Sequence, residues 1–267
     1  MNATVGQAAG VASLEGKVAL VTGATSTFGI GRVSARAMAM AGAYVFVTGR
    51  NPDTGAETVA EIEAVGGQTS FLKLDVTVEK DWVEAMAAVR QQFGRLDILV
   101  NNAGNAISGL IEDLPLDTVW YLAHLNIEGA FLGTTHAWPL MRDSGGVVLD
   151  INSVAGQGGS IGGTGYPSSK GGMLGVSRAA AIDGRRHGIR VVSVHPGSTW
   201  TPGMERVRGI TRDEYDRRIT ESGRIPLGHS AESEDVAAAL VYLASDAASH
   251  ITGIEYNVDG GAGAGSG

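Results

Sequence analysis

The chain has 267 residues, of which 43% are hydrophobic and 18% are charged, so it can bury a sizeable core and is not a disordered chain. Its net charge of −8, without a basic cluster, argues against nucleic-acid binding. It has no cysteine and no metal-ligand spacing of histidines, so we expect neither disulfides nor a bound metal. Without a long apolar run or a signal-peptide pattern, we expect a cytoplasmic protein that does not bind membranes.

Residues 1–14 are small and polar and predict a flexible N-terminal arm. Residues 17–22 form a nearly continuous apolar run, which is typical of a strand buried on both faces of a parallel sheet. A glycine-rich loop and a helical pattern over 32–40 follow. This order favours pyrophosphate binding, because glycines let the backbone approach and a helix N-terminus offers N–H groups. A flexible strand-to-helix turn without a ligand is the alternative interpretation.

The second expected strand, residues 44–48, ends in Gly49-Arg50. In dinucleotide-binding folds an acidic residue near this position holds the ribose hydroxyls of NAD, and here there is none. A guanidinium pairs well with a 2′-phosphate, so Arg50 favours NADP, with NAD still possible. The alternative is a surface arginine at the strand end.

Strands and helices alternate through the rest of the chain. We expect strands at 69–74, 97–100, 146–151, 190–194 and 254–258, and helices at 54–65, 78–93, 116–141, 166–183 and 233–243. The alternation predicts an α/β fold: a single doubly wound Rossmann-type domain, residues 15–261, with a mostly parallel seven-stranded sheet and helices on both faces. A glycine-rich tail, 262–267, follows it.

Three residues carry the expected chemistry. Tyr166 and Lys170 are four apart, so in a helix both project from one face. We expect the lysine ammonium to lower the pKa of the phenol, which makes Tyr166 a candidate general acid or base. Ser153 lies just past the strand 146–151, at the sheet edge where ligands of such folds bind, and could hold a substrate oxygen. A solvated helix face with an unrelated lysine would also explain the Tyr-x-x-x-Lys spacing.

These residues and several short motifs together resemble the classical short-chain dehydrogenase/reductase family. The resemblance covers residues 14–261 and includes Asn101-Asn102-Ala103-Gly104 and Asp259-Gly260-Gly261. It implies a catalytic set of Ser153, Tyr166, Lys170 and Asn126, the last anchoring a water that links the lysine to solvent. It further implies that the cofactor contacts are Gly23, Ser26, Gly29, Ile30, Gly31, Arg50, Asp75, Val76, Asn102, Ala103, Gly104, Tyr166, Lys170, Pro196, Gly197, Thr199 and Thr201.

The chain departs from the family pattern in its first loop. Five residues separate Gly23 from Gly29, two more than usual, so the hydroxyls of this loop have no clear counterparts. Longer loops of this kind also occur in enoyl reductases of the superfamily. Those relatives space their tyrosine and lysine further apart, and the short spacing here therefore favours carbonyl chemistry. A smaller departure is Asn152, where a serine is common.

The resemblance implies hydride transfer between NADP(H) and a carbonyl or secondary alcohol, with Tyr166 as general acid/base. An enoyl or imine reductase and a non-catalytic dinucleotide-binding protein are the alternatives. A substrate lid is expected at about 198–226, where interleaved charges favour a salt-bridged helix and Trp200 is a candidate pocket wall. We interpret His195 as packing at a strand end. The expected partners are a small-molecule substrate and further copies of the chain, as a homodimer or homotetramer.

Overall fold

The computed structural model describes residues 12–27, 29–159, 162–201 and 209–264. Seven strands form one sheet in the order β3-β2-β1-β4-β5-β6-β9, and every neighbouring pair is parallel. The strands are β1 Val18–Val21, β2 Tyr44–Gly49, β3 Gln68–Lys73, β4 Ile98–Asn101, β5 Gly146–Ile151, β6 Ile189–Pro196 and β9 Glu255–Val258. The predicted doubly wound sheet is confirmed, and the strand order reverses between β1 and β4.

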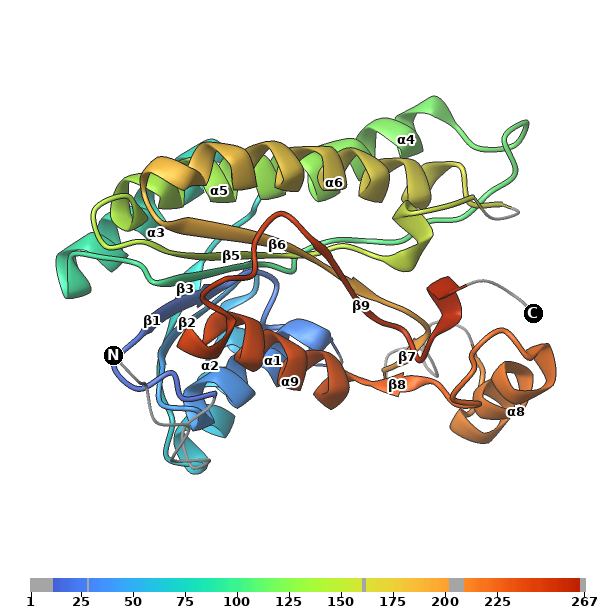
Figure 1. Ribbon diagram of the computed structural model, residues 1–267, viewed down its shortest axis with the longest axis horizontal. Coiled ribbons are helices and arrows are strands. Elements are labelled where there is room, and N and C mark those ends of the chain that lie inside the picture. Colours follow the sequence, from blue (N-terminus) through green and yellow to red (C-terminus); the bar gives the residue numbers. More distant parts are fainter. Residues whose placement is uncertain (1–11, 28, 160–161, 202–208, 265–267) are drawn as a thin grey trace.

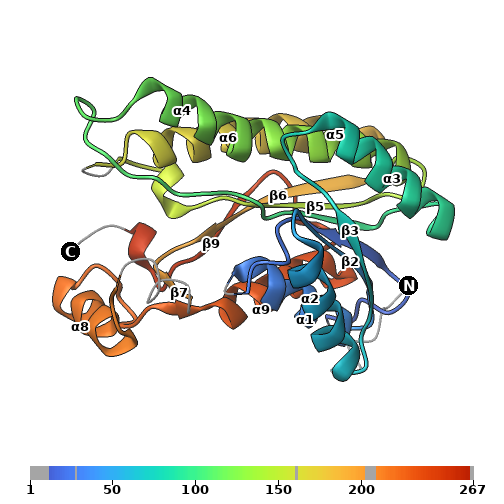
Figure 2. The same cartoon turned by 180° about the vertical axis from the view of Figure 1, so that it is seen from behind.

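Helices cover both faces of this sheet (Figure 1). One face carries α1 Ile30–Met40, α2 Pro52–Ala64 and α9 Ser233–Ala244. The other carries α3 Glu79–Phe93, α4 Leu116–Ala123, α5 Gly129–Met141 and α6 Gly165–Asp183. Figure 2 shows the same three layers from behind. No helix in the described part of the chain is long and apolar enough to cross a membrane.

The sheet separates two apolar cores, and β1 shows why. Side chains alternate along a strand, so Ala19 and Val21 join the core under α1 and α9, whereas Val18 and Leu20 join the core under α3 and α5. All four are buried, which explains the continuous apolar run in the sequence. Burying one Val or Leu side chain contributes about 1.5–3 kcal/mol, so the strands are held firmly from both sides.

The helix expected over 116–141 is interrupted near its middle. A π-helical turn, η1 His124–Glu128, joins α4 to α5 and contains Asn126. Such single π turns often occur at functional sites, because the extra residue in the turn redirects side chains. The sequence pattern gave no sign of this turn.

The segment after β6 contains a short parallel pair, β7 Thr199–Trp200 and β8 Ala231–Glu232, and the helix α8 Arg212–Ser222. The expected salt-bridged helix is confirmed, because α8 carries the i,i+4 pairs Arg212–Asp216, Arg217–Glu221 and Arg218–Glu214. Trp200 is buried and its ring lies 5.4 Å from that of Tyr215. It therefore packs α8 against β7.

Two expected boundaries shift slightly. Leu14 is fully buried and its N–H donates to Ala41 O at 2.8 Å, so this last residue of the expected arm belongs to the core. At the other end Ala262–Ala264 form a short 3-10 helix, η5, in place of the start of a tail. Residues 1–11 of the arm, 202–208 of the lid and 265–267 of the tail lie outside the described residues.

Candidate active site

The catalytic candidates meet at the carboxyl end of β5. Ser153 follows this strand and caps the 3-10 turn η2 Val154–Gly156, where its Oγ accepts from Ala155 N at 3.1 Å. Because that oxygen already accepts one bond, its own O–H remains to donate. A side-chain hydrogen bond joins it to Tyr166, which lies on the first turn of α6. The predicted Ser153–Tyr166 pair is thus brought together from two separate elements.

Lys170 lies one turn along α6 from Tyr166 and is buried. Its Nζ donates to Ile151 O at 2.7 Å and lies 6.0 Å from the centre of the Tyr166 ring. Burial lowers the pKa of Lys170 to about 8, and the carboxylate of Asp150 opposes this by favouring the charged form. The ammonium is therefore present at neutral pH, close to the point where it begins to titrate.

The expected effect of this lysine on the phenol is wrong in the ligand-free site. Burial raises the pKa of Tyr166, and it is the hydrogen bond from Ser153 that lowers it. Lys170 Nζ donates to Ile151 O and lies 6.0 Å from the centre of the ring, so its charge does not offset the cost of burying the phenolate. At neutral pH Tyr166 is therefore a protonated acid.

Asn126 connects the π-helical turn to its two neighbours. Its Nδ2 donates to Ser169 Oγ on α6 at 2.8 Å and to Asn105 O at 3.0 Å, and its Oδ1 accepts from Asn105 N at 3.0 Å. A Cβ added to Gly104 would lie 2.8 Å from Asn126 Oδ1 and 3.6 Å from Lys170 Nζ. Glycine at this position thus lets the loop after β4 pass between the amide and the amine.

Asp150 is a buried acid that the sequence reading passed over. It accepts from Asn101 Nδ2 at 2.8 Å and from Ser177 Oγ at 2.5 Å, and burial raises its pKa. It faces the charge of Lys170 across the carboxyl end of β5. The only signal in the sequence is one carboxylate in an otherwise apolar strand, Gly146–Ile151.

The glycine loop and the start of α1 form a second part of the site. Gly23 has φ +64°, and a Cβ there would meet Ala103 Cα at 3.0 Å. Among the described residues, no side chain caps α1 at Gly29 and no acidic residue occupies its first turn. Such an N-terminus suits an anion. In the lengthened loop Thr25 is buried against Gly49, while Ser26 is exposed beside Gly29.

Asn102 and Ala103 are fixed beside this loop by Thr22, whose hydroxyl accepts from both backbone N–H groups at 2.9 Å. Asn102 Nδ2 also donates to Thr22 O, and a Cβ on Gly31 would collide with that Nδ2 at 2.3 Å. The three expected contact groups from β1, α1 and β4 therefore share one edge of the sheet.

The remaining cofactor candidates lie at the same edge, on either side. At the end of β6, Pro196 and Gly197 lead into Thr199 and Thr201, with Thr199 buried. At the ends of β2 and β3, Arg50 Nη1 lies 3.9 Å from Asp75 Oδ2, and the Arg50 side chain is 79% exposed. Val76 is buried against α5. Glycines at the carboxyl ends of the strands and the uncapped N-terminus of α1 fit a dinucleotide that lies across the sheet edge where the strand order reverses, between β1 and β4.

Comparison with known proteins agrees with this geometry. Residues 23–263 match a family model described as enoyl-(acyl carrier protein) reductase. The chain is 36% identical to trans-4-hydroxycyclohexanecarboxylate dehydrogenase of Sinomonas cyclohexanicum, over 94% of both chains. Among solved structures, it matches a 7α-hydroxysteroid dehydrogenase complexed with NADH and 7-oxo glycochenodeoxycholic acid, with a TM-score of 0.86, 32% identity and coverage of 94% and 95%.

An actinorhodin polyketide ketoreductase with NADPH matches equally well, with a TM-score of 0.86, 31% identity and coverage of 92% of this chain and 97% of the other. Both of these related structures contain a nicotinamide dinucleotide. The chain belongs to the short-chain dehydrogenase/reductase family, as an NAD(P)-dependent oxidoreductase that acts on alcohol and carbonyl groups.

Proposed function

We propose that this protein transfers a hydride between NADP(H) and a carbonyl or secondary alcohol, with Tyr166 as the general acid or base. The observation that carries the proposal is the hydrogen-bonded Ser153–Tyr166 pair above buried Lys170. A pure binding protein has no use for a half-buried acid joined to a second hydroxyl. When bound, the nicotinamide supplies the hydride for reduction or accepts it in oxidation.

The side chains then handle one proton. In reduction, Ser153 O–H donates a hydrogen bond to the substrate oxygen and Tyr166 transfers its proton to that oxygen as the alcohol forms. Tyr166 suits this direction, because burial raises its pKa and keeps it protonated at neutral pH. Oxidation of the alcohol needs the phenolate as a base, so the rate of oxidation increases as the pH rises. Lys170 does not lower the pKa of Tyr166 in the ligand-free site, and we propose that its positive charge favours the phenolate once substrate and cofactor are bound.

Preference for NADP is supported by Arg50. Its guanidinium is exposed at the carboxyl end of β2, and Asp75, 3.9 Å away, keeps it at this edge of the sheet. No acidic residue ends β2, so no carboxylate of that strand repels a 2′-phosphate. The residues that would hold the cofactor are the predicted set: the Gly23–Gly31 loop, Arg50, Asp75, Val76, the Asn102–Gly104 segment and the residues from Pro196 to Thr201.

The substrate is a small molecule held under residues 198–226, which we assign as the lid. In the described part of the lid, Arg212 forms an ion pair with Glu232 and lies 5.6 Å from the Trp200 ring. These contacts fix α8 against β7 and β8. A second candidate function is reduction of an enoyl C=C bond, favoured by the description of the matching family model. The four-residue spacing of Tyr166 and Lys170 favours the carbonyl.

The test is oxidation of NADPH or NADH by the purified protein with a panel of cyclic ketones, an enoyl thioester and a cyclic imine, and the reverse reaction with the matching alcohols. We expect turnover of a ketone–alcohol pair with NADPH. Turnover of the enoyl thioester alone would replace the proposal with the second candidate, and no turnover on any substrate would contradict both.

We also propose that the protein is a homodimer or homotetramer, and that it is cytoplasmic. Large apolar side chains are exposed on neighbouring helices, including Leu116 and Trp120 on α4 and Phe131 on α5. Side chains of this kind are often covered when copies associate. Light scattering coupled to size-exclusion chromatography measures the mass, and a monomer at micromolar concentration would contradict this part of the proposal.

A further inference from the structure

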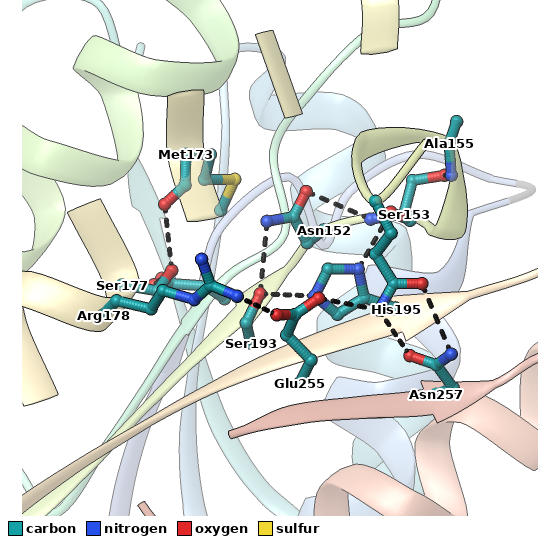
Figure 3. A network of polar contacts seen from close by, with 12 residues as sticks. Asn152, Ser153, Ala155, Met173, Ser177, Arg178, Ser193, His195, Glu255 and Asn257 are labelled. Carbon is teal, nitrogen blue, oxygen red and sulfur yellow. Dashed lines mark hydrogen bonds and ion pairs between the residues drawn. The ribbon is translucent and has the colours of Figure 1, made fainter. Parts of the chain in front are cut away.

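A closed ring of buried polar groups lies directly behind Ser153 (Figure 3). It consists of Asn152, Ser153, Ser193 and His195, and is called here the His195 ring. Asn152 is 3% exposed, Ser193 2% and His195 0%. Buried polar side chains normally have full hydrogen-bond partners, and each of these side chains finds its partners within the ring. The ring links the end of β5 to the end of β6.

Chemistry fixes the direction of every bond in the His195 ring. Ser153 O can only accept, so His195 Nδ1, 2.9 Å away, carries the proton. In the neutral imidazole Nε2 then accepts, and the Ser193 hydroxyl donates to it over 2.8 Å. Ser193 Oγ in turn accepts from Asn152 Nδ2 at 3.1 Å, and Asn152 Oδ1 accepts from Ser153 N at 3.1 Å. The ring is therefore complete only with His195 as the Nδ1–H tautomer.

The charges around His195 are compatible with this neutral form. Burial lowers the pKa of His195. The hydrogen bond to Ser153 O and the charge of Glu255 on β9 oppose this, and Lys170 and Arg178 on α6 reinforce it. Glu255 Oε2 lies 4.0 Å from His195 Nε2 and is itself held by Gln157 Nε2 at 2.9 Å and by Arg178. With its carboxylate occupied by these partners, Glu255 does not form a hydrogen bond to the ring.

The His195 ring holds both backbone groups of Ser153. The N–H of Ser153 donates to Asn152 Oδ1. The carbonyl of Ser153 accepts from His195 Nδ1 and also from Gly156 N, the latter at 2.9 Å. The side-chain oxygen is held by Ala155 N. With its N–H, carbonyl and side-chain oxygen each held in this way, Ser153 has only its hydroxyl hydrogen left to donate, and that hydrogen is directed toward Tyr166 and the substrate site.

We propose that His195, as the Nδ1–H tautomer, is a positioning residue that aims the Ser153 hydroxyl at the substrate oxygen through the Ser153 carbonyl. This inference rests on the proposed function for its catalytic consequence. It goes beyond packing at a strand end, since packing requires the shape of the imidazole and not a proton at a particular nitrogen. His195 does not contact the substrate and takes no part in proton transfer.

The tautomer of His195 can be determined by NMR spectroscopy, without any measurement of enzyme activity. In protein labelled with ¹⁵N-histidine, the long-range ¹H–¹⁵N spectrum at pH 7.5 distinguishes Nδ1–H, Nε2–H and imidazolium rings. The His195 signals are those missing from His195→Asn. We expect the Nδ1–H pattern. An Nε2–H or imidazolium pattern for His195 overturns the proposal, whatever the activity of the enzyme.

Two variants separate the bond from the packing. Asparagine places an amide N–H where Nδ1 stands and can still donate to Ser153 O, whereas glutamine places its amide at the Nε2 end. We expect kcat for ketone reduction to fall about fivefold in His195→Gln, the effect of one lost hydrogen bond, and to stay within about twofold in His195→Asn. KM for NADPH and the unfolding temperature should be similar in the two variants.

His229→Gln is the matched control, because His229 also directs Nδ1 at a backbone carbonyl, that of Ser230, on the exposed surface. It should behave as wild type. Equal losses in the asparagine and glutamine variants, or wild-type kcat in both, overturn the positioning role. If the wild-type protein turns over no substrate, the proposed function fails, while the spectrum still decides the state of the ring.

Discussion

The two halves of the sheet edge hold their functional residues in different ways. On the β4–β5–β6 side, Lys170, Asp150 and His195 are all at most 4% exposed, and each polar atom that matters has a named partner. On the β2–β3 side, Arg50 is 79% exposed and its ion pair with Asp75 spans 3.9 Å. The first half is shielded from solvent, and the second is open to it.

This difference sets the size of the effects that mutations can have. In a buried site a charge or proton acts through a low dielectric and cannot be replaced by water, so one atom can change the rate by orders of magnitude. An exposed guanidinium is screened by salt and competes with water. We therefore expect the β5–β6 side to control catalysis and the β2 side to adjust cofactor preference.

The largest effect is expected for Tyr166→Phe, which removes only the phenolic oxygen. Without the proton donor, kcat for ketone reduction should fall by about 10²- to 10⁴-fold, the usual contribution of a general acid. The dissociation constant for NADPH, measured by fluorescence titration, should change little because the ring remains. Tyr242→Phe on α9 makes the same change far from the site and should leave kcat unaltered. A kcat near wild type in Tyr166→Phe would end the assignment of Tyr166.

A smaller effect is expected from Asp150→Asn, which keeps the shape but removes the charge that faces Lys170. In the wild-type protein Lys170 loses its proton near pH 8, so kcat for reduction should decline as the pH rises through about 8. Without the carboxylate the charged form of Lys170 is less favoured. Its pKa falls further, and the decline should begin about one pH unit lower.

The measurement is the pH profile of kcat for reduction between pH 6 and 10. Asp183→Asn, the same change at the exposed end of α6, is the control and should leave the profile in place. A decline that moved to higher pH in Asp150→Asn would contradict the assigned coupling, since it would mean that the carboxylate disfavours the lysine charge.

The smallest of these three effects is expected from Arg50→Gln. Loss of the exposed guanidinium should lower kcat/KM for NADPH about tenfold at low salt and leave that for NADH nearly unchanged, because only NADPH carries the 2′-phosphate. Raising the salt concentration should shrink the difference. Arg36→Gln, on the exposed face of α1, is the control. A clear preference of the wild-type protein for NAD would contradict the assignment of Arg50.

Much of the fold followed from local patterns. Apolar runs such as 17–22 predicted buried parallel strands, because only a sheet covered on both faces hides every side chain of a strand. The Tyr166–Lys170 spacing predicted one helix face, since helical periodicity depends only on position in the chain. Interleaved charges predicted the ion pairs of α8 for the same reason: their partners are four residues apart.

The features that sequence reasoning missed all depend on partners distant in the chain. The pKa of Tyr166 was expected to be lowered by Lys170, yet burial and Ser153 control it. The π-helical turn at Asn126 and the buried acid Asp150 take their roles from α6 and β4.

The sequence by itself determined the order of the strands and helices, the glycine turn and the set of residues that carry the chemistry, because these are local in the chain. Only the tertiary structure decided how those residues are tuned: it buried Lys170 beside Asp150 and closed the ring between Ser153 and His195. The physical reason is that desolvation and hydrogen-bond direction depend on which atoms surround a group in space. That environment forms only when β5, β6 and α6 have packed together.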